Sequence, residues 1–244
     1  MTDDFVTVNQ TLALPLDTSW DVADVDIIET DTHPNFHQVT AHALVTGRSG
    51  GRDRLWSWGG TSDQLTAKLY VFTPDGDGGG SWSSESVPDS ITRGQFGAST
   101  TCQDRMVYFG GRLRASTDDS VRNIDGSSSI ALPGVLQYNF EDATWENKTS
   151  EGWTEKWATY QRGELVCADV KDRDPVVVAI GGAAIPSTNA YDDTGELLDM
   201  SKILFWDMKG EKWHSQKTGG QRKPQSRQGF CAVGAASKNG TYEM

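Results

Sequence analysis

Three stretches of the chain share one pattern, in which a run of apolar residues ends in two glycines. They read LWSWGG at 55–60, MVYFGG at 106–111 and VVVAIGG at 176–182. Such short runs, rich in β-branched and aromatic residues, are typical of strands covered on both faces by neighbouring sheets. A glycine pair is expected where the backbone adopts a conformation closed to other residues or closely approaches another segment. The recurrence predicts three similar β units.

Each glycine pair is followed by an aromatic strand, a short polar turn and a tryptophan. The residues of this second element are Tyr70 and Trp82, Tyr138 and Trp145, and Phe205 and Trp213. We expect each ring to pack between adjacent sheets, where burial contributes about 2–3 kcal/mol. A strand of small residues led by Phe96 precedes the second apolar run, residues 164–169 take that place before the third, and a similar strand led by Phe230 lies at the C-terminal end. Each complete unit therefore holds four strands.

Four strands per unit, recurring every ~50–70 residues, are typical of the blades of a β-propeller. Each blade hides its faces only against its neighbours, so the units must stack side by side. The six glycines and the downstream aromatic residues resemble the repeats of the kelch family, most of all those of fungal kelch proteins. The glycines are Gly59, Gly60, Gly110, Gly111, Gly181 and Gly182. The resemblance spans nearly the whole chain and implies an all-β, kelch-type propeller.

The units divide the chain into complete blades and two incomplete ends. Complete blades are predicted at 37–85, 93–149 and 159–217, with half-blades at 7–22 and 227–244. In the first half-blade, strands are expected at 7–16 and 19–22. Because relatives in this family usually have six or seven blades, the resemblance implies a segment of a longer propeller. The alternative is that the two half-blades combine and close a four-bladed ring. A segment exposes strand edges, so self-association is expected.

The loops of the predicted units are unequal in length. The long ones, at 61–66, 112–133 and 183–201, emerge on the same face as the connections between blades. Long loops on one face of a rigid scaffold are where binding usually resides. The candidate binding residues are Arg112, Arg114, Asp118, Asp119, Asn189, Tyr191, Asp192 and Asp193. The sequence thus predicts a non-catalytic scaffold that binds a protein partner on this face.

Charge and composition limit the classes of partner that are expected for this chain. The formal net charge of −12 repels phosphate backbones, which argues against nucleic acid as a partner. No apolar run is long enough to insert into a membrane. Cys102, Cys167 and Cys231 form an odd, sparse set and are expected to be small buried thiols. The compartment stays open, although sequons at Asn9, Asn147 and Asn239 hint at a secretory route.

Two other functions remain as alternatives. The first is a metal-dependent enzyme on the same scaffold, for which the histidines are His33, His37, His42 and His214. Pro34 opposes the helix that the spacing of His33 and His37 would need, and in the iron pattern of plant specifier proteins Arg93 stands where histidine is required. We therefore predict no metal and no cofactor. The second alternative is carbohydrate binding through aromatic residues and acidic loops.

Overall fold

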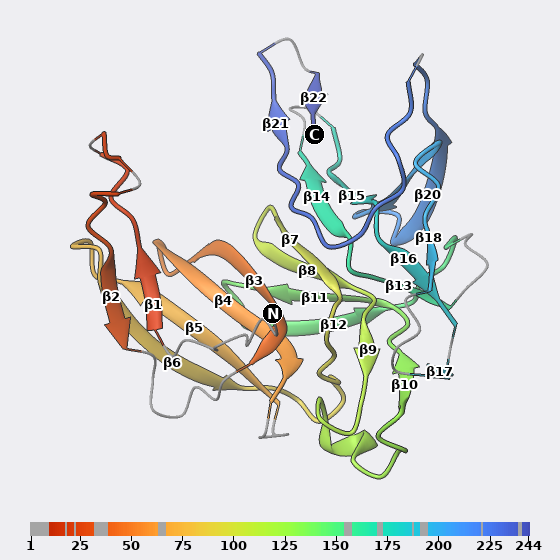
Figure 1. The fold of residues 1–244 in the computed structure, drawn as a ribbon, viewed down its shortest axis with the longest axis horizontal. Coiled ribbons are helices and arrows are strands. Elements are labelled where there is room, and N and C mark those ends of the chain that lie inside the picture. The colour runs from red at the N-terminus through yellow and green to blue at the C-terminus, as the bar shows by residue number, and fades with distance from the viewer. Residues whose placement is uncertain are drawn as a thin grey trace.

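The computed structural model describes the chain apart from residues 1–9, 18, 22, 32–38, 63–66, 154–157, 170–172, 187, 191–194, 221 and 239–240, and describes only the backbone of 188–190. The described residues form antiparallel sheets and one short 3₁₀ helix, with no α-helix (Figure 1). The predicted all-β class is confirmed. Within this part of the chain, no helix is long and apolar enough to cross a membrane.

Three four-stranded sheets make up most of the structure, and in each the strands lie in sequence order. The first sheet contains β3 (Thr40–Ser49), β4 (Arg52–Thr61), β5 (Lys68–Pro74) and β6 (Gly80–Ser86). The second contains β7 (Ala98–Cys102), β8 (Arg105–Phe109), β11 (Val135–Asn139) and β12 (Thr144–Lys148). The third contains β14 (Glu164–Ala168), β15 (Val176–Ile180), β19 (Lys202–Asp207) and β20 (Lys212–Lys217).

Short strands occupy the ends of the chain and the long loops. At the ends, β1 (Gln10–Ala13) pairs with β2 (Ile28–Asp31), and β21 (Ala235–Ala236) pairs with β22 (Tyr242–Glu243). The loops contain β9 (Arg112–Leu113), the 3₁₀ helix η1 (Asp119–Val121), β10 (Ser128–Ala131), β13 (Thr159–Gln161), β16 (Ala183–Ile185), β17 (Thr188–Ala190) and β18 (Glu196–Leu197).

The two ends of the chain do not join a common sheet. The N-terminal hairpin takes its second strand from β2 rather than from 19–22, whose described residues are not in a strand. β1–β2 and β21–β22 are separate two-stranded sheets, and Figure 1 shows them on opposite sides of an opening. The described residues therefore do not close the four-bladed ring that was the alternative.

The glycine pairs fasten each sheet to the next. All six glycines have positive φ, between 54° and 90°. The second glycine of each pair donates its N–H to a backbone carbonyl of the following repeat, from Gly60 to Gly94 at 2.8 Å, from Gly111 to Tyr160 at 2.7 Å and from Gly182 to Arg227 at 2.7 Å. A Cβ on the first glycine of each pair would lie under 3.0 Å from that same carbonyl oxygen. Close backbone approach and left-handed geometry thus both require glycine.

A second set of hydrogen bonds joins the starts of the repeats. Ala41, Phe96, Arg162 and Gly229 all adopt left-handed conformations, with φ of 58°, 61°, 53° and 65°. Phe96 N donates to Ala41 O at 3.1 Å, Arg162 N to Phe96 O at 2.9 Å, and Gly229 N to Arg162 O at 2.8 Å. The first strands of the three sheets also contact one another in order, β3 with β7 and β7 with β14. The same backbone arrangement therefore occurs four times, and the fourth occurrence lies in the C-terminal segment.

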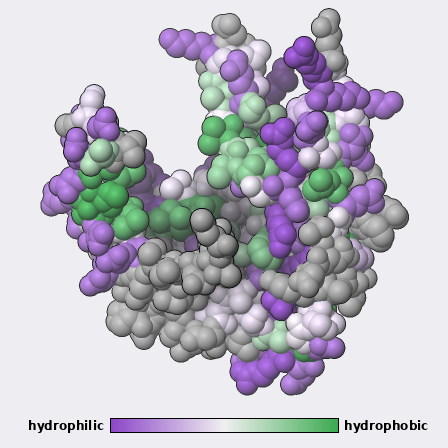
Figure 2. Space-filling model, viewed as in Figure 1, coloured by the Kyte–Doolittle hydropathy of each residue, from purple (hydrophilic) through white to green (hydrophobic). Residues whose placement is uncertain are grey.

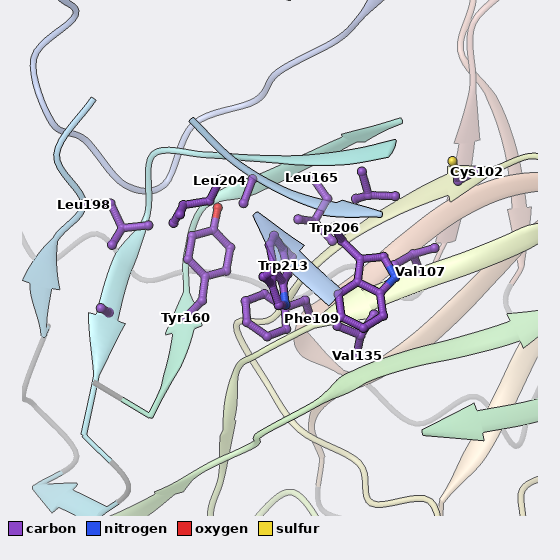
Figure 3. Close-up of a cluster of buried hydrophobic side chains, with 14 residues drawn as sticks. Cys102, Val107, Phe109, Val135, Tyr160, Leu165, Leu198, Leu204, Trp206 and Trp213 are labelled. Atoms are coloured by element: carbon purple, nitrogen blue, oxygen red, sulfur yellow. The ribbon is translucent and has the colours of Figure 1, made fainter. Parts of the chain in front are cut away.

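Aromatic side chains fill the two spaces between the large sheets. Trp56 of the first sheet stacks on Phe140 with ring centroids 4.2 Å apart. Between the second and third sheets, Phe109 contacts Trp213 at 4.6 Å in a cluster that also includes Tyr160 and Trp206 (Figure 3). Because these rings come from different sheets, their burial holds the repeats side by side.

The register of the strands revises the predicted aromatic pairs. Directly opposite the tryptophans Trp82, Trp145 and Trp213 lie Phe72, Tyr138 and Trp206. Tyr70 lies two residues before Phe72 on the same strand and is also buried. Phe205 precedes the fully buried Trp206, and neighbouring strand residues face opposite ways, so Phe205 stacks on His214 instead.

The prediction of three buried thiols is wrong. Cys102 and Cys167 form a disulfide with Cα atoms 5.2 Å apart, and Cys231 is exposed. Cys102 ends β7 and Cys167 lies in β14, the first strands of adjacent sheets. Sixty-five residues separate the two cysteines in sequence, so only the stacking of the sheets brings them together.

A buried phenol also links the first two sheets. Tyr138 Oη donates a hydrogen bond to Glu85 Oε2 at 2.6 Å, and burial followed by this carboxylate raises the pKa of Tyr138. We expect Tyr138→Phe to lower the free energy of unfolding by about 1.5–3 kcal/mol, because the bond has a charged acceptor. Chemical unfolding followed by tryptophan fluorescence measures this loss. Glu85→Gln, which keeps an acceptor, should lose less, and a Tyr138→Phe protein as stable as wild type would disprove the link.

Candidate functional site

Small sheets join the long loops of the second and third large sheets into one platform. β10 pairs with β9 of its own loop and with β17 of the next loop, in the register Ile130 to Leu113 and Ser128 to Ala190. β16 pairs with β13 and β18. The loops predicted at 112–133 and 183–201 are therefore partly built of strands, of which β9, β10 and β17 lie in the lower part of Figure 1. The platform gives the loop face a fixed shape.

Arg112 is a buried centre of this platform. Arg112 is only 2% exposed, and its Nε donates a hydrogen bond to Gln161 Oε1 at 2.5 Å. Its Nη1 lies 3.4 Å from Ser129 Oγ, and its backbone exchanges two hydrogen bonds with Gln95. The residue was predicted to contact a partner, but its position assigns it to holding three loop segments together.

Arg93 and Asp118 form a second buried link. The backbone N–H of Arg93 donates to Asp118 Oδ2 at 2.9 Å, and Arg93 Nε donates to Thr117 O at 2.6 Å. Asp118 Oδ1 also accepts from the N–H of Ser120 at 3.0 Å, which caps η1. Burial lowers the pKa of Arg93, and the negative charge of Asp118 opposes that shift. The link fixes η1 against the connection between the first two sheets.

A groove of about 490 Å³ opens beside this link on the loop face. It is lined by residues 67–68, 86–89, 91 and 118–120, which come from the loops of the first and second large sheets. Asp89 and Asp119 are exposed on its rim, and Lys68 is half-buried. Asp119 pairs with Arg122 Nη2 at 2.5 Å, but both side chains are exposed and such a pair contributes little to stability. The lining of the groove mixes polar and apolar residues, and its charged groups are more often acidic than basic.

The structure brings two of the predicted binding residues, Asp118 and Asp119, to this groove. Arg114 lies within its own loop, where Nη2 donates to Gly126 O at 3.1 Å. Asn189 is in β17 opposite Ser129, and its side chain lies outside the description. Tyr191, Asp192 and Asp193 lie outside the described residues.

Sequence reasoning missed Lys68, Asp89 and Ser120 as groove residues. Asp89 lies in the connection between the first two units, and Lys68 begins the strand that follows the loop 61–66, so both lie in or next to segments that the loop argument had placed on this face. That position was the available signal. Ser120 lies within the loop predicted at 112–133 and so carried the same signal, although its place at the groove also depends on the contact with Asp118.

The histidines are not gathered in the described part of the chain. His33 and His37 lie outside it, and His214 stacks on Phe205 with centroids 5.4 Å apart. Among the residues that are described, no group of three or more His, Cys, Asp or Glu side chains is placed to hold a metal ion.

Comparison with known proteins bears on the fold only. No family model and no curated protein matches this sequence. Among solved structures, 108 chains match, and one of them is the structure of YjhT, with a TM-score of 0.54 and 13% sequence identity. The match covers 86% of this chain and 52% of the YjhT chain, so this chain spans about half the length of that structure. At this identity the likeness shows a shared arrangement of sheets and carries no function.

Proposed function

We propose that the chain is a segment of a kelch-like β-propeller and that it serves as a non-catalytic scaffold for a protein partner. Three like sheets in sequence order, fastened by the same two sets of backbone hydrogen bonds, support the propeller assignment. The repeat continues into a fourth unit at Gly229, and the likeness to a longer solved structure agrees with a segment. The kelch assignment rests on the glycine pairs and on the aromatic residues that follow each pair in sequence.

The observation that carries the binding role is the groove between the loops of the first two sheets. The walls of the groove are held in place by buried contacts as well as exposed ones, because the hydrogen bonds of Arg93 with Asp118 and Thr117 fix the position of η1. A surface held in place before binding loses little conformational freedom when a partner docks. Rigidly supported loops are also where scaffolds usually carry their binding residues.

The charges of the groove indicate the chemistry of the partner. Asp89 and Asp119 stand on the rim, and the chain as a whole carries a net charge of −12. Complementary potentials speed encounter and suppress wrong partners. The partner surface that fits is therefore polar and basic, with donors for the carboxylates of the rim and an acceptor for Lys68.

Site-specific photo-crosslinking tests this assignment. A benzoylphenylalanine introduced at Asp119 should give a discrete crosslinked partner in cells that make the protein, because Asp119 is exposed at the groove. The same group at Asp142, exposed in the turn between β11 and β12, is the matched control on the opposite face. Mass spectrometry of the crosslinked species identifies the partner.

A charge variant gives the second arm of this test. Asp89→Lys should reduce the crosslink from position 119 about tenfold or more if the rim selects a basic surface, since like charges across an interface cost several kcal/mol. Crosslinks that form equally from position 142, or that survive Asp89→Lys unchanged, would reject the groove as the binding site.

A further inference from the structure

One N-x-Thr sequon lies on the described surface of the protein. It consists of Asn147, Lys148 and Thr149, and both Asn147 and Thr149 are exposed. The sequons at Asn9 and Asn239 begin outside the described residues. A sequon is an acceptor for asparagine-linked carbohydrate, which is bulky and therefore needs a surface position. Asn147 meets that requirement.

The fold gives the side chain of Asn147 a place at the border of a packed strand face. Asn147 lies opposite Leu136 of β11. It follows Trp145 by two residues, so it shares the face of β12 on which that indole contacts Trp58 with ring centroids 4.7 Å apart. Gly134 has φ of +94°, and a Cβ there would lie 2.7 Å from Asn147 Oδ1. The glycine therefore leaves the space that the Asn147 amide occupies.

β12 is the edge strand of the second large sheet. It pairs with β11 on one side, and its other side is the edge of the sheet. An edge strand presents backbone N–H and C=O groups that can pair with another chain, so proteins cover or charge such edges. Figure 2 shows hydrophilic and apolar surface side by side on the described chain, and exposed apolar surface adds to the risk of association. A glycan on β12 would cover this edge with solubilising bulk.

The disulfide between Cys102 and Cys167 indicates the compartment in which the chain folds. Disulfides form and persist in oxidising compartments such as the lumen of the endoplasmic reticulum, and they are rare in the cytosol. This bond joins β7 of the second sheet to β14 of the third, so it belongs to the packing of the large sheets. Asparagine-linked glycans are attached on the same secretory route. The disulfide and the exposed sequon are independent observations that agree on this route.

We propose that Asn147 carries an asparagine-linked glycan and that the protein folds in an oxidising secretory compartment. The donor is an oligosaccharide that a diphosphate joins to a lipid. Asn147 Nδ2 displaces the diphosphate from the first sugar, so a carbon–nitrogen bond forms and the carbon–oxygen bond to the diphosphate breaks. The nitrogen loses one proton as the diphosphate leaves, and no oxidant or reductant takes part. The site uses none of the groove residues, so its test is independent of the proposed binding role.

Mass spectrometry of the full-length protein from cells that make it tests the proposal. Release of the glycan with peptide N-glycosidase F in heavy-oxygen water converts a glycosylated asparagine to a labelled aspartate, so the peptide that contains Asn147 should carry the label. A parallel sample without the enzyme corrects for spontaneous deamidation. The same protein, mapped without reductant, should contain the linked peptides of Cys102 and Cys167. An Asn147 that stays unlabelled would overturn the proposal, as would free thiols at both cysteines.

Substitutions at Thr149 provide the matched controls. Thr149→Ala removes the hydroxyl of the sequon and Thr149→Ser keeps it, and both change one exposed residue that follows β12. Thr149→Ala should abolish the label at Asn147, whereas Thr149→Ser should retain it. Both variants should fold, because the substituted side chain is exposed, and thermal melting checks this. A label that survives Thr149→Ala would contradict a glycan attached through this sequon.

Discussion

Gly110→Ala is expected to lower the free energy of unfolding by about 2–5 kcal/mol, through left-handed strain and overpacking together. Gly110 has φ of +76°, and a Cβ placed there would lie under 3.0 Å from the carbonyl oxygen of Tyr160. That oxygen accepts the 2.7 Å hydrogen bond from Gly111, so it cannot retreat without loss of the link between the second and third sheets. Urea unfolding followed by tryptophan fluorescence measures the change.

Substitutions at two other glycines measure the contributions of left-handed strain and of overpacking separately. Gly50 has φ of +57° with nothing within 4 Å of an added Cβ, so Gly50→Ala should cost only the conformational share, about 1 kcal/mol. Gly126 has open space and no positive φ, so Gly126→Ala should stay within about 0.5 kcal/mol of wild type. If Gly110→Ala costs no more than Gly50→Ala, the close approach to Tyr160 does not fasten the sheets.

Removal of the disulfide should have an effect of similar size. Cys102 and Cys167 close a loop of about 65 residues, for which the chain-entropy account gives about 4 kcal/mol. The double variant Cys102→Ala, Cys167→Ala is therefore expected to lose that much free energy of unfolding and to unfold at a lower urea concentration. Peptide mapping without reductant detects the bond directly.

The third cysteine supplies the control for this experiment. Cys231 is exposed and outside the disulfide, so Cys231→Ala should leave stability within about 0.5 kcal/mol of wild type. Reductant should destabilise the wild-type protein and leave the double variant unchanged. Equal stability of wild type with and without reductant would contradict a structural role for the bond.

Local patterns predicted the large sheets well. The apolar runs that end in glycine pairs became β4, β8 and β15, because a buried strand and a positive φ both leave marks on neighbouring residues. The register was harder to predict, since Phe205 and Trp206 are both aromatic and only the pairing with Trp213 decides which one faces the second sheet. The disulfide and the loop strands join residues far apart in sequence, which a local pattern cannot reveal.

In the candidate site, too, local features were predicted from the sequence and tertiary contacts were not. The loop face was predicted from loop lengths, and Asp118 and Asp119 do lie at the groove. The burial of Arg112 could not be predicted, because its partners Gln161 and Ser129 come from other loops and reach it only in the folded chain. An arginine in a long loop is usually exposed, and this one is an exception created by its tertiary contacts.

The left-handed residues at the start of each repeat bear on how such a chain can evolve. The same kind of bond recurs along the series, donated by Phe96 to Ala41, by Arg162 to Phe96 and by Gly229 to Arg162, so Phe96 and Arg162 both accept and donate it. A duplicated unit inserted between any two of them would find a ready donor on one flank and a ready acceptor on the other. Gene duplication could therefore lengthen the array by whole modules without inventing a new joint, and divergence would then be left to the loops.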